Sequence, residues 1–62
     1  MEWINVNNKM PEYDGQYLCV VHEIEECGAE YNRIKVMTQH MAIFVENHNQ
    51  RVTHWMTLPE LP

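Results

Sequence analysis

Residues 16–23 read Gln-Tyr-Leu-Cys-Val-Val-His-Glu, and this stretch decides the fold of the chain. Every residue from Tyr17 to Val21 is apolar, and the β-branched and aromatic side chains among them favour a strand. A strand that is apolar on both faces is typical of the interior of a sheet. We therefore expect residues 16–23 to form the central strand of a sheet.

Segments of weaker β character lie on both sides of this strand. Trp3 to Val6 alternates apolar and polar residues, which predicts a short edge strand or an extended arm. The acidic stretch 24–31 predicts a loop, and the polar run 47–50 predicts a turn. Residues 38–39 either form a tight reversal or lie within one long bent strand. The remaining strands are expected in three segments: 33–38, 40–46 and 52–56.

No segment sustains the apolar i, i+3, i+4, i+7 spacing of a helix. The sequence instead predicts one small, mainly β domain over residues 1–62, with roughly four to five short strands in an antiparallel meander. Because so small a sheet needs cover on one face, we expect the N-terminal arm and the Pro-containing C-terminal tail to pack across it. Their residues would form a structural clasp: Trp3, Ile4, Trp55, Leu58, Pro59 and Leu61.

Composition excludes several classes of protein. Nine acidic against four basic residues give a net charge of −5, which argues against direct binding of nucleic acid. No apolar run approaches the ~20 residues of a membrane span, and the N-terminus lacks a secretion signal, so no membrane partner is expected. Without secretion, Cys19 and Cys27 are expected to be reduced thiols, as in a cytoplasmic protein.

The acidic stretch is the most informative polar feature. Residues 23–30 contain four glutamates and no basic residue: Glu23, Glu25, Glu26 and Glu30. One interpretation is a solvated loop that keeps a small protein soluble. The other is a charged patch that steers the protein towards a basic surface on a partner, which makes these four glutamates the candidate partner-binding residues.

Nothing in the sequence predicts catalysis, a cofactor or a metal site. The chain has no serine, and Cys19 and His22 would point to opposite faces of a strand. Cys27 has carboxylates as neighbours, which raise a thiol pKa. The paired spacings of zinc sites and a glycine-rich phosphate loop are both missing from the sequence. We therefore expect no enzymatic activity. Three histidines keep an open role: His40, His48 and His54.

The two ends of the chain carry a signature. Residues 3–6 read Trp-Ile-Asn-Val and are followed by Met10-Pro11, and residues 52–62 read Val-Thr-His-Trp-Met-Thr-Leu-Pro-Glu-Leu-Pro. These ends resemble the W-I-x-V…L-P opening and the V-T-H-W-M-P-L-P-E-P-P ending of a small phage and prophage family, catalogued as domain of unknown function 551. The chain departs from that pattern at Met10, Thr57 and Leu61. The resemblance implies a phage or prophage source and a location in the bacterial cytoplasm, and it implies no particular activity.

Size and resemblance together favour a small accessory protein that acts by binding a host or phage protein. Two alternatives stay open at this point. One is a small-ligand or nucleotide-binding module with its site at a dimer interface, and the other is a structural accessory of a phage assembly. A homodimer is a further expectation, because so small a core benefits from shared burial.

Overall fold

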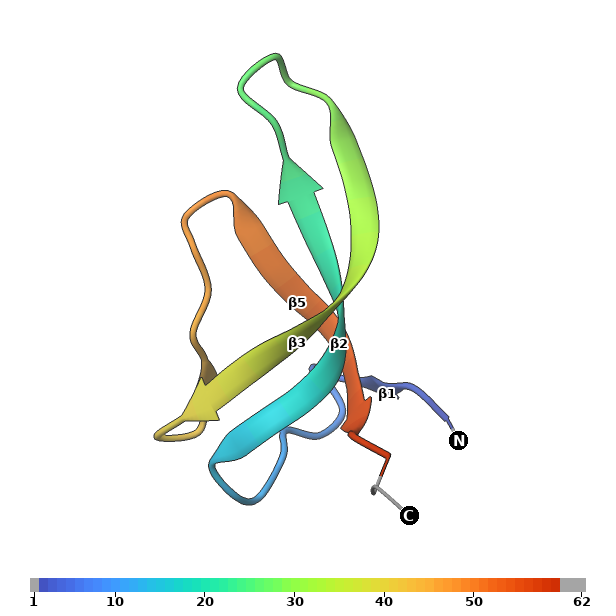
Figure 1. Ribbon diagram of the computed structural model, residues 1–62, viewed down its shortest axis with the longest axis vertical. Coiled ribbons are helices and arrows are strands. Elements are labelled where there is room, and N and C mark those ends of the chain that lie inside the picture. Colours follow the sequence, from blue (N-terminus) through green and yellow to red (C-terminus); the bar gives the residue numbers. More distant parts are fainter. Residues whose placement is uncertain (1, 60–62) are drawn as a thin grey trace.

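The computed structural model describes residues 2–59, which form one curled sheet of five antiparallel strands and contain no helix (Figure 1). The strands are β1 (Ile4–Asn5), β2 (Gly15–Ile24), β3 (Glu30–His40), β4 (Ile43–Phe44) and β5 (Gln50–Thr57). The prediction of a small, mainly β protein is confirmed. Over the same residues, no helix is long and apolar enough to span a membrane.

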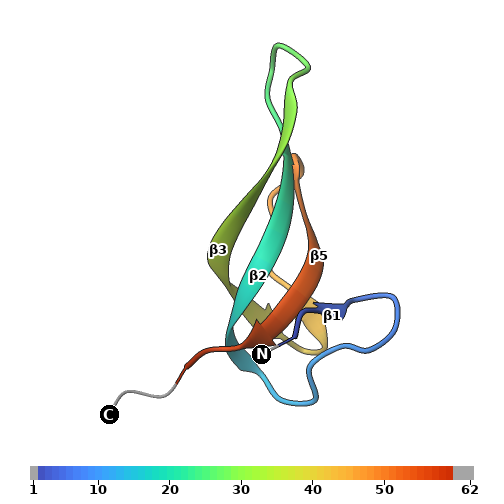
Figure 2. The ribbon, with the colours of Figure 1, turned by 90° about the vertical axis from the view of Figure 1, so that its right-hand side faces the viewer.

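The strand order is β1-β5-β2-β3-β4. β2 is the central strand, as its apolar sequence predicts, with β3 along one side and β5 along the other (Figure 2). Strands β2, β3 and β4 follow one another as in a meander. The last strand, however, returns to the far side of β2 and separates it from β1, so the sheet as a whole departs from the predicted meander order.

Residues 38–39 do not form the tight reversal that is one of their two interpretations; they lie within a strand, as the other proposes, but that strand ends before residues 41–42 instead of continuing to 46. Thr38 and Gln39 are part of β3, and the chain turns at Met41 and Ala42, whose φ angles are 54° and 68°. Two successive positive φ values are the geometry of a tight two-residue hairpin, which usually contains Asn or Gly. The expected strand over 40–46 is consequently reduced to the two residues of β4.

The core lies on the inner face of the curl. It is formed by residues from β2, β4 and β5: Cys19, Val21, Phe44, Val52 and Trp55. The ring of Tyr17 meets the edges of two aromatic side chains from different strands, Trp55 at 5.4 Å and Phe44 at 6.3 Å between ring centroids. Such edge-to-face contacts are favourable, and here they join the two sides of the curled sheet.

The N-terminal segment is attached to the sheet by pairing and by hydrogen bonds. Ile4 pairs with Trp55, and the Trp55 indole nitrogen donates a hydrogen bond of 2.8 Å to the carbonyl of Lys9. Further along, the side-chain amide nitrogen of the buried Gln39 donates to the carbonyl of Pro11 at 2.7 Å. The start of the chain thus borders β5 and closes one end of the core.

The predicted clasp is corrected at several positions. Trp3 is 39% exposed and lies outside the core. The reason is that neighbouring residues of an extended chain point to opposite faces: Ile4, which pairs with Trp55, lies on the face that carries Trp55, and Trp3 lies on the other. Leu58 and Pro59 follow the end of β5 and are exposed, so they do not cover the sheet. Leu61 lies outside the described residues.

Candidate functional site

The β2–β3 hairpin forms an arm that projects beyond the rest of the molecule. We define this hairpin arm as residues 22–32; it contains the ends of both strands and the turn between them. In Figures 1 and 2 the turn lies at the end of the molecule opposite both termini. The turn is closed by two backbone hydrogen bonds of 2.8 Å, from Glu25 to Ala29 and from Gly28 to Glu25. Gly28 has a φ of 90°, a conformation that favours glycine.

The four glutamates predicted as one patch are divided between different environments. Glu25, Glu26 and Glu30 are exposed on the arm, whereas Glu23 is only 8% exposed on the inner face. The difference follows from strand alternation, since Glu23 has the same parity as the core residue Val21. The expectation that Glu23 belongs to an exposed acidic patch is therefore wrong.

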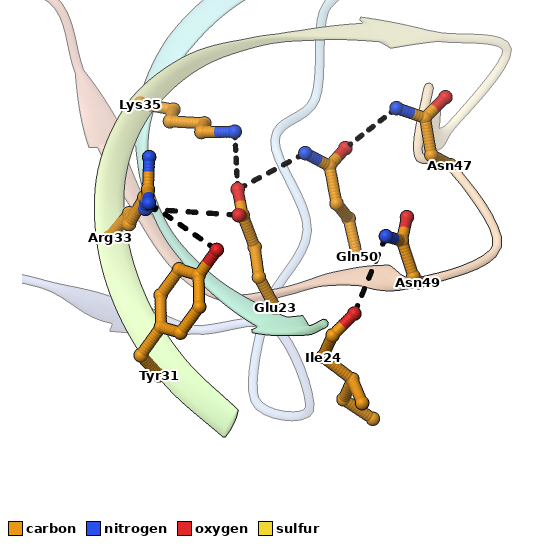
Figure 3. Close-up of polar contacts among 8 residues, drawn as sticks. All are labelled: Glu23, Ile24, Tyr31, Arg33, Lys35, Asn47, Asn49 and Gln50. Carbon is orange, nitrogen blue, oxygen red and sulfur yellow. Dashed lines mark hydrogen bonds and ion pairs between the residues drawn. The ribbon is translucent and has the colours of Figure 1, made fainter. Parts of the chain in front are cut away.

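Glu23 is the centre of a polar cluster at the end of the core. Its carboxylate forms an ion pair with Lys35 and lies 3.8 Å from Nε of Arg33. The side-chain amide of Gln50 donates to the same carboxylate at 3.1 Å (Figure 3). The hydrogen bond from Lys35, supported by Gln50 and by the charge of Arg33, holds the pKa of Glu23 below its ordinary value despite burial.

Two cations share this single carboxylate, and one of them also contacts an aromatic ring. The guanidinium carbon of Arg33 lies 4.6 Å from the ring centroid of Tyr31, and its Nη2 donates to the Tyr31 hydroxyl at 3.3 Å. The pKa of Tyr31 is raised, mainly by a hydrogen bond to Glu25 and further by burial. The inner face of β3 therefore carries two basic groups paired directly with one acid.

The outer face of the arm holds a histidine whose two ring nitrogens both lie within hydrogen-bond distance of oxygen atoms. One ring nitrogen of His22 lies 3.1 Å from the side-chain oxygen of Asn32, and the other lies 3.2 Å from the carboxylate of Glu30. Both partners accept hydrogen bonds, so both ring nitrogens carry a hydrogen when both bonds are made. These bonds raise the pKa of His22, against smaller opposing effects of burial and of the charge of Arg51. Glu30 is thus paired with His22.

The remaining charges lie at the end of the arm. Glu25 and Glu26, which we call the acidic tip, are exposed, and within residues 2–59 neither forms an ion pair. The Cys27 thiol donates to the Glu25 carboxylate at 3.6 Å. Of the four predicted partner-binding residues, only these two present carboxylates without a cationic partner.

Among residues 2–59 the other titratable side chains form no further centre. Burial raises the pKa of the Cys19 thiol to about 11, and both cysteines are free. His40 lies 3.4 Å from the carboxylate of Asp14, and His54 contacts the Thr53 hydroxyl at 3.0 Å. No group of three metal-ligating side chains occurs within the described part of the chain.

The histidine not yet placed, His48, lines a recess of about 270 Å³ beside His22 and Arg51. Drug-sized ligands usually occupy closed pockets of about 300–1,000 Å³ lined mainly by apolar groups. This recess is smaller and polar residues predominate in its lining: His22, His48, Asn49, Gln50 and Arg51, with Ile24 as the apolar member. The recess therefore resembles a surface hollow more than a ligand pocket.

Sequence reasoning missed the polar cluster, although a signal for it exists. The alternation over 33–38 places Arg33 and Lys35 on one face of a strand. What the alternation does not reveal is the neighbour strand, in which Val21 pairs with Arg33 and Glu23 pairs with Tyr31. The register therefore brings Glu23 close to Arg33 across the two strands, and Lys35, which pairs with Cys19, reaches the same carboxylate through its long side chain.

The comparisons with known proteins give a match to a family model and to no individual protein. No curated protein and no solved structure matches the chain. The model of the family described as "Protein of unknown function (DUF551)" matches residues 2–62. A match over nearly the whole length shows the family, and the chain therefore belongs to the DUF551 family.

Proposed function

We propose that this protein is a small accessory protein without enzymatic activity, which binds another protein through the acidic tip. One observation supports this proposal: Glu25 and Glu26 are exposed at the end of a projecting arm and have no cationic partner among the described residues. Unpaired charge at a projecting end attracts oppositely charged surfaces and raises the rate of encounter. The partner would present a basic surface.

The signature at the chain ends supports the remaining parts of the proposal. A phage or prophage source makes a host or phage protein the partner, and the bacterial cytoplasm the place of action. We prefer this function to a small-ligand module because the recess beside His48 is smaller than usual ligand pockets. A structural role in a phage assembly would also use a protein-binding surface, and identification of the partner separates the two.

The experiment compares two double variants that remove the same charge. Glu25→Gln/Glu26→Gln neutralises the acidic tip, and Glu2→Gln/Glu12→Gln neutralises two exposed glutamates outside the arm. A tagged wild-type protein is expected to capture its partner from bacterial lysate in a salt-sensitive manner, and the tip variant is expected to lose about tenfold in capture. The control variant keeps wild-type capture. Equal capture by all three proteins, or capture that is indifferent to salt, would contradict the proposal.

A further inference from the structure

Strand β3 has an open edge over most of its length. On one side it pairs with β2 from Glu30 to Gln39, whereas on the other side β4 pairs only with Gln39 and His40. One more backbone bond, from Val45 to the carbonyl of Thr38 at 2.8 Å, ends this pairing. Residues 30–37 of β3 therefore have no neighbouring strand on that side within the described chain. In Figure 2 β3 lies beside β2 on the side away from β5, and the open edge is the edge of β3 that faces away from β2.

The backbone groups that face this edge can be assigned. Thr38 directs its carbonyl to β4, and backbone direction alternates along a strand. Asn32, Ile34 and Val36 have the same parity as Thr38, so their N–H and C=O groups face the open edge. The intervening residues, such as Arg33 and Lys35, direct their backbone groups towards β2. The open edge is therefore a regular row of donors and acceptors.

Other edges of the sheet are short or capped. β1 has only two residues. On β5, beyond the part that β1 covers, the carboxylate of Glu46 accepts a hydrogen bond of 2.6 Å from the N–H of Val52. Proteins commonly protect exposed edges by such means, because unpaired strand edges attract other strands. Among the edges described here, β3 stands out as long and uncapped.

The two faces beside this edge differ in chemistry. On the outer face Ile34 and Val36 are 64% and 51% exposed and lie next to Val20 and Leu18 of β2. On the inner face Arg33 and Lys35 share the one carboxylate of Glu23. A strand added here would place alternate side chains beside an aliphatic surface and beside two basic groups. Cross-strand pairs are favourable when aliphatic groups meet and when opposite charges meet.

We propose that the open edge of β3 binds an extended segment of a partner protein in which acidic residues alternate with aliphatic ones. The backbone of the segment would extend the sheet at Asn32, Ile34 and Val36. Its aliphatic side chains would pack on the outer face, and its carboxylates would approach Arg33 and Lys35. This surface is separate from the acidic tip and its basic partner, so the inference goes beyond the proposed function.

A second copy of the chain fits this edge poorly. In an antiparallel pair between residues 30–36 of two copies, Arg33 lies opposite Arg33 of the other copy. A shift by one pairing step places Arg33 opposite Lys35. Like charges directly opposite one another destabilise a strand pair. The basic residues therefore disfavour self-association and favour an acidic strand, which is how a repulsive element contributes to specificity.

The test uses a fluorescently labelled peptide of about nine residues with alternating Val and Glu, long enough to span the open segment. Two comparison peptides are a Val/Lys alternation and a scrambled sequence with the Val/Glu composition. In fluorescence anisotropy the Val/Glu peptide is expected to bind at least about tenfold more tightly than either comparison peptide, with an affinity that falls as salt is added. Equal binding of the three peptides, or no binding of the Val/Glu peptide, overturns the proposal.

Ile34→Pro is the selective variant. The N–H of Ile34 faces the open edge, so proline removes no bond to β2, and edge positions of this kind are where strands tolerate proline. Ile34→Thr, which keeps the N–H and the β-branched shape, is the matched control. Proline is expected to reduce peptide binding about tenfold or more, whereas threonine is expected to reduce it less than proline does. Thermal melting checks that each variant is folded.

Two further measurements test binding at the β3 edge without relying on Ile34→Pro. Arg33→Gln, which leaves the Lys35–Glu23 ion pair in place, is expected to weaken the Val/Glu peptide without strengthening the scrambled one. The small core predicted a homodimer, whereas the like charges at this edge predict that the wild-type protein sediments as a monomer. A dimer that the Val/Glu peptide cannot dissociate would show that a second copy occupies the edge. The tip variant Glu25→Gln/Glu26→Gln is expected to retain peptide binding. A negative result with the peptides would therefore contradict the proposal for the β3 edge and leave the proposal for the acidic tip unaffected.

Discussion

The indole nitrogen of Trp55 donates a hydrogen bond of 2.8 Å to the carbonyl of Lys9, across 46 residues of chain. This bond links the last strand to the segment that follows the first. Trp55 also packs edge-to-face on Tyr17, so one side chain connects the core to the N-terminal segment. The stability of the fold should therefore depend strongly on Trp55 and little on Trp3, which is half-exposed.

Trp55→Phe tests this asymmetry. The smaller ring leaves the Lys9 carbonyl without its donor and creates a small void, which together should lower the free energy of unfolding by about 1–3 kcal/mol. Trp3→Phe is the matched control and should change it by no more than about 0.5 kcal/mol, as is usual for surface positions. Urea unfolding followed by circular dichroism measures both. Equal losses in the two variants would contradict the role assigned to Trp55.

The turn between β3 and β4 should be strained. Ala42 has a φ of 68°, and residues other than glycine reach this region at a cost. Ala42→Gly is therefore expected to raise the free energy of unfolding by about 0.5–1 kcal/mol. Ala29→Gly, at an alanine of the β2–β3 turn without a positive φ, should not stabilise the protein. A thermal melt of the two variants decides, and a lower melting temperature for Ala42→Gly would refute the strain.

Glu23 should make the stability depend on pH on the acid side. Its pKa in the folded protein lies below the ordinary value of 4.5, chiefly through the hydrogen bond from Lys35. The stabilisation is therefore present above pH 4.5 and is lost as the pH falls through the lowered pKa. Glu23→Gln should be less stable than wild type at pH 7 and should lose less on acidification. Glu26→Gln, without an ion pair in the described chain, serves as the control; matching pH profiles for the wild type and Glu23→Gln would count against the cluster.

His22 should make the stability depend on pH in the opposite direction to Glu23. Hydrogen bonds to Asn32 and Glu30 raise its pKa above 6.5, so its contribution to stability is complete below pH 6.5 and is lost as the pH rises through the raised pKa. An NMR titration of the histidine rings should give His22 a higher pKa in the wild type than in Glu30→Gln. Melting temperatures between about pH 5 and pH 8 should fall more in the wild type than in His22→Gln. A His22 pKa at or below 6.5 would disprove this arrangement.

Much of the sheet could be predicted because its signals are local. Residues 17–21 are apolar at every position, and the central place of β2 follows from that pattern alone. The polar run 47–50 leads from β4 into β5 as a turn should. The reversal at Met41 and Ala42 could not be predicted, since neither residue is one that such turns prefer. There the bond from the Met41 N–H to the Asp14 carboxylate at 3.1 Å supports the turn.

The candidate surfaces show the same division. The sequence by itself determined that the chain forms a small β-sheet, that 23–30 is acidic, and which family the chain belongs to. Only the tertiary structure decided that the carboxylate of Glu23 forms ion pairs while those of Glu25 and Glu26 have no cationic partner in the described chain. It also decided that β3 keeps an open edge. The physical reason is that strand register and strand order depend on pairing between distant segments, which no local pattern of residues encodes.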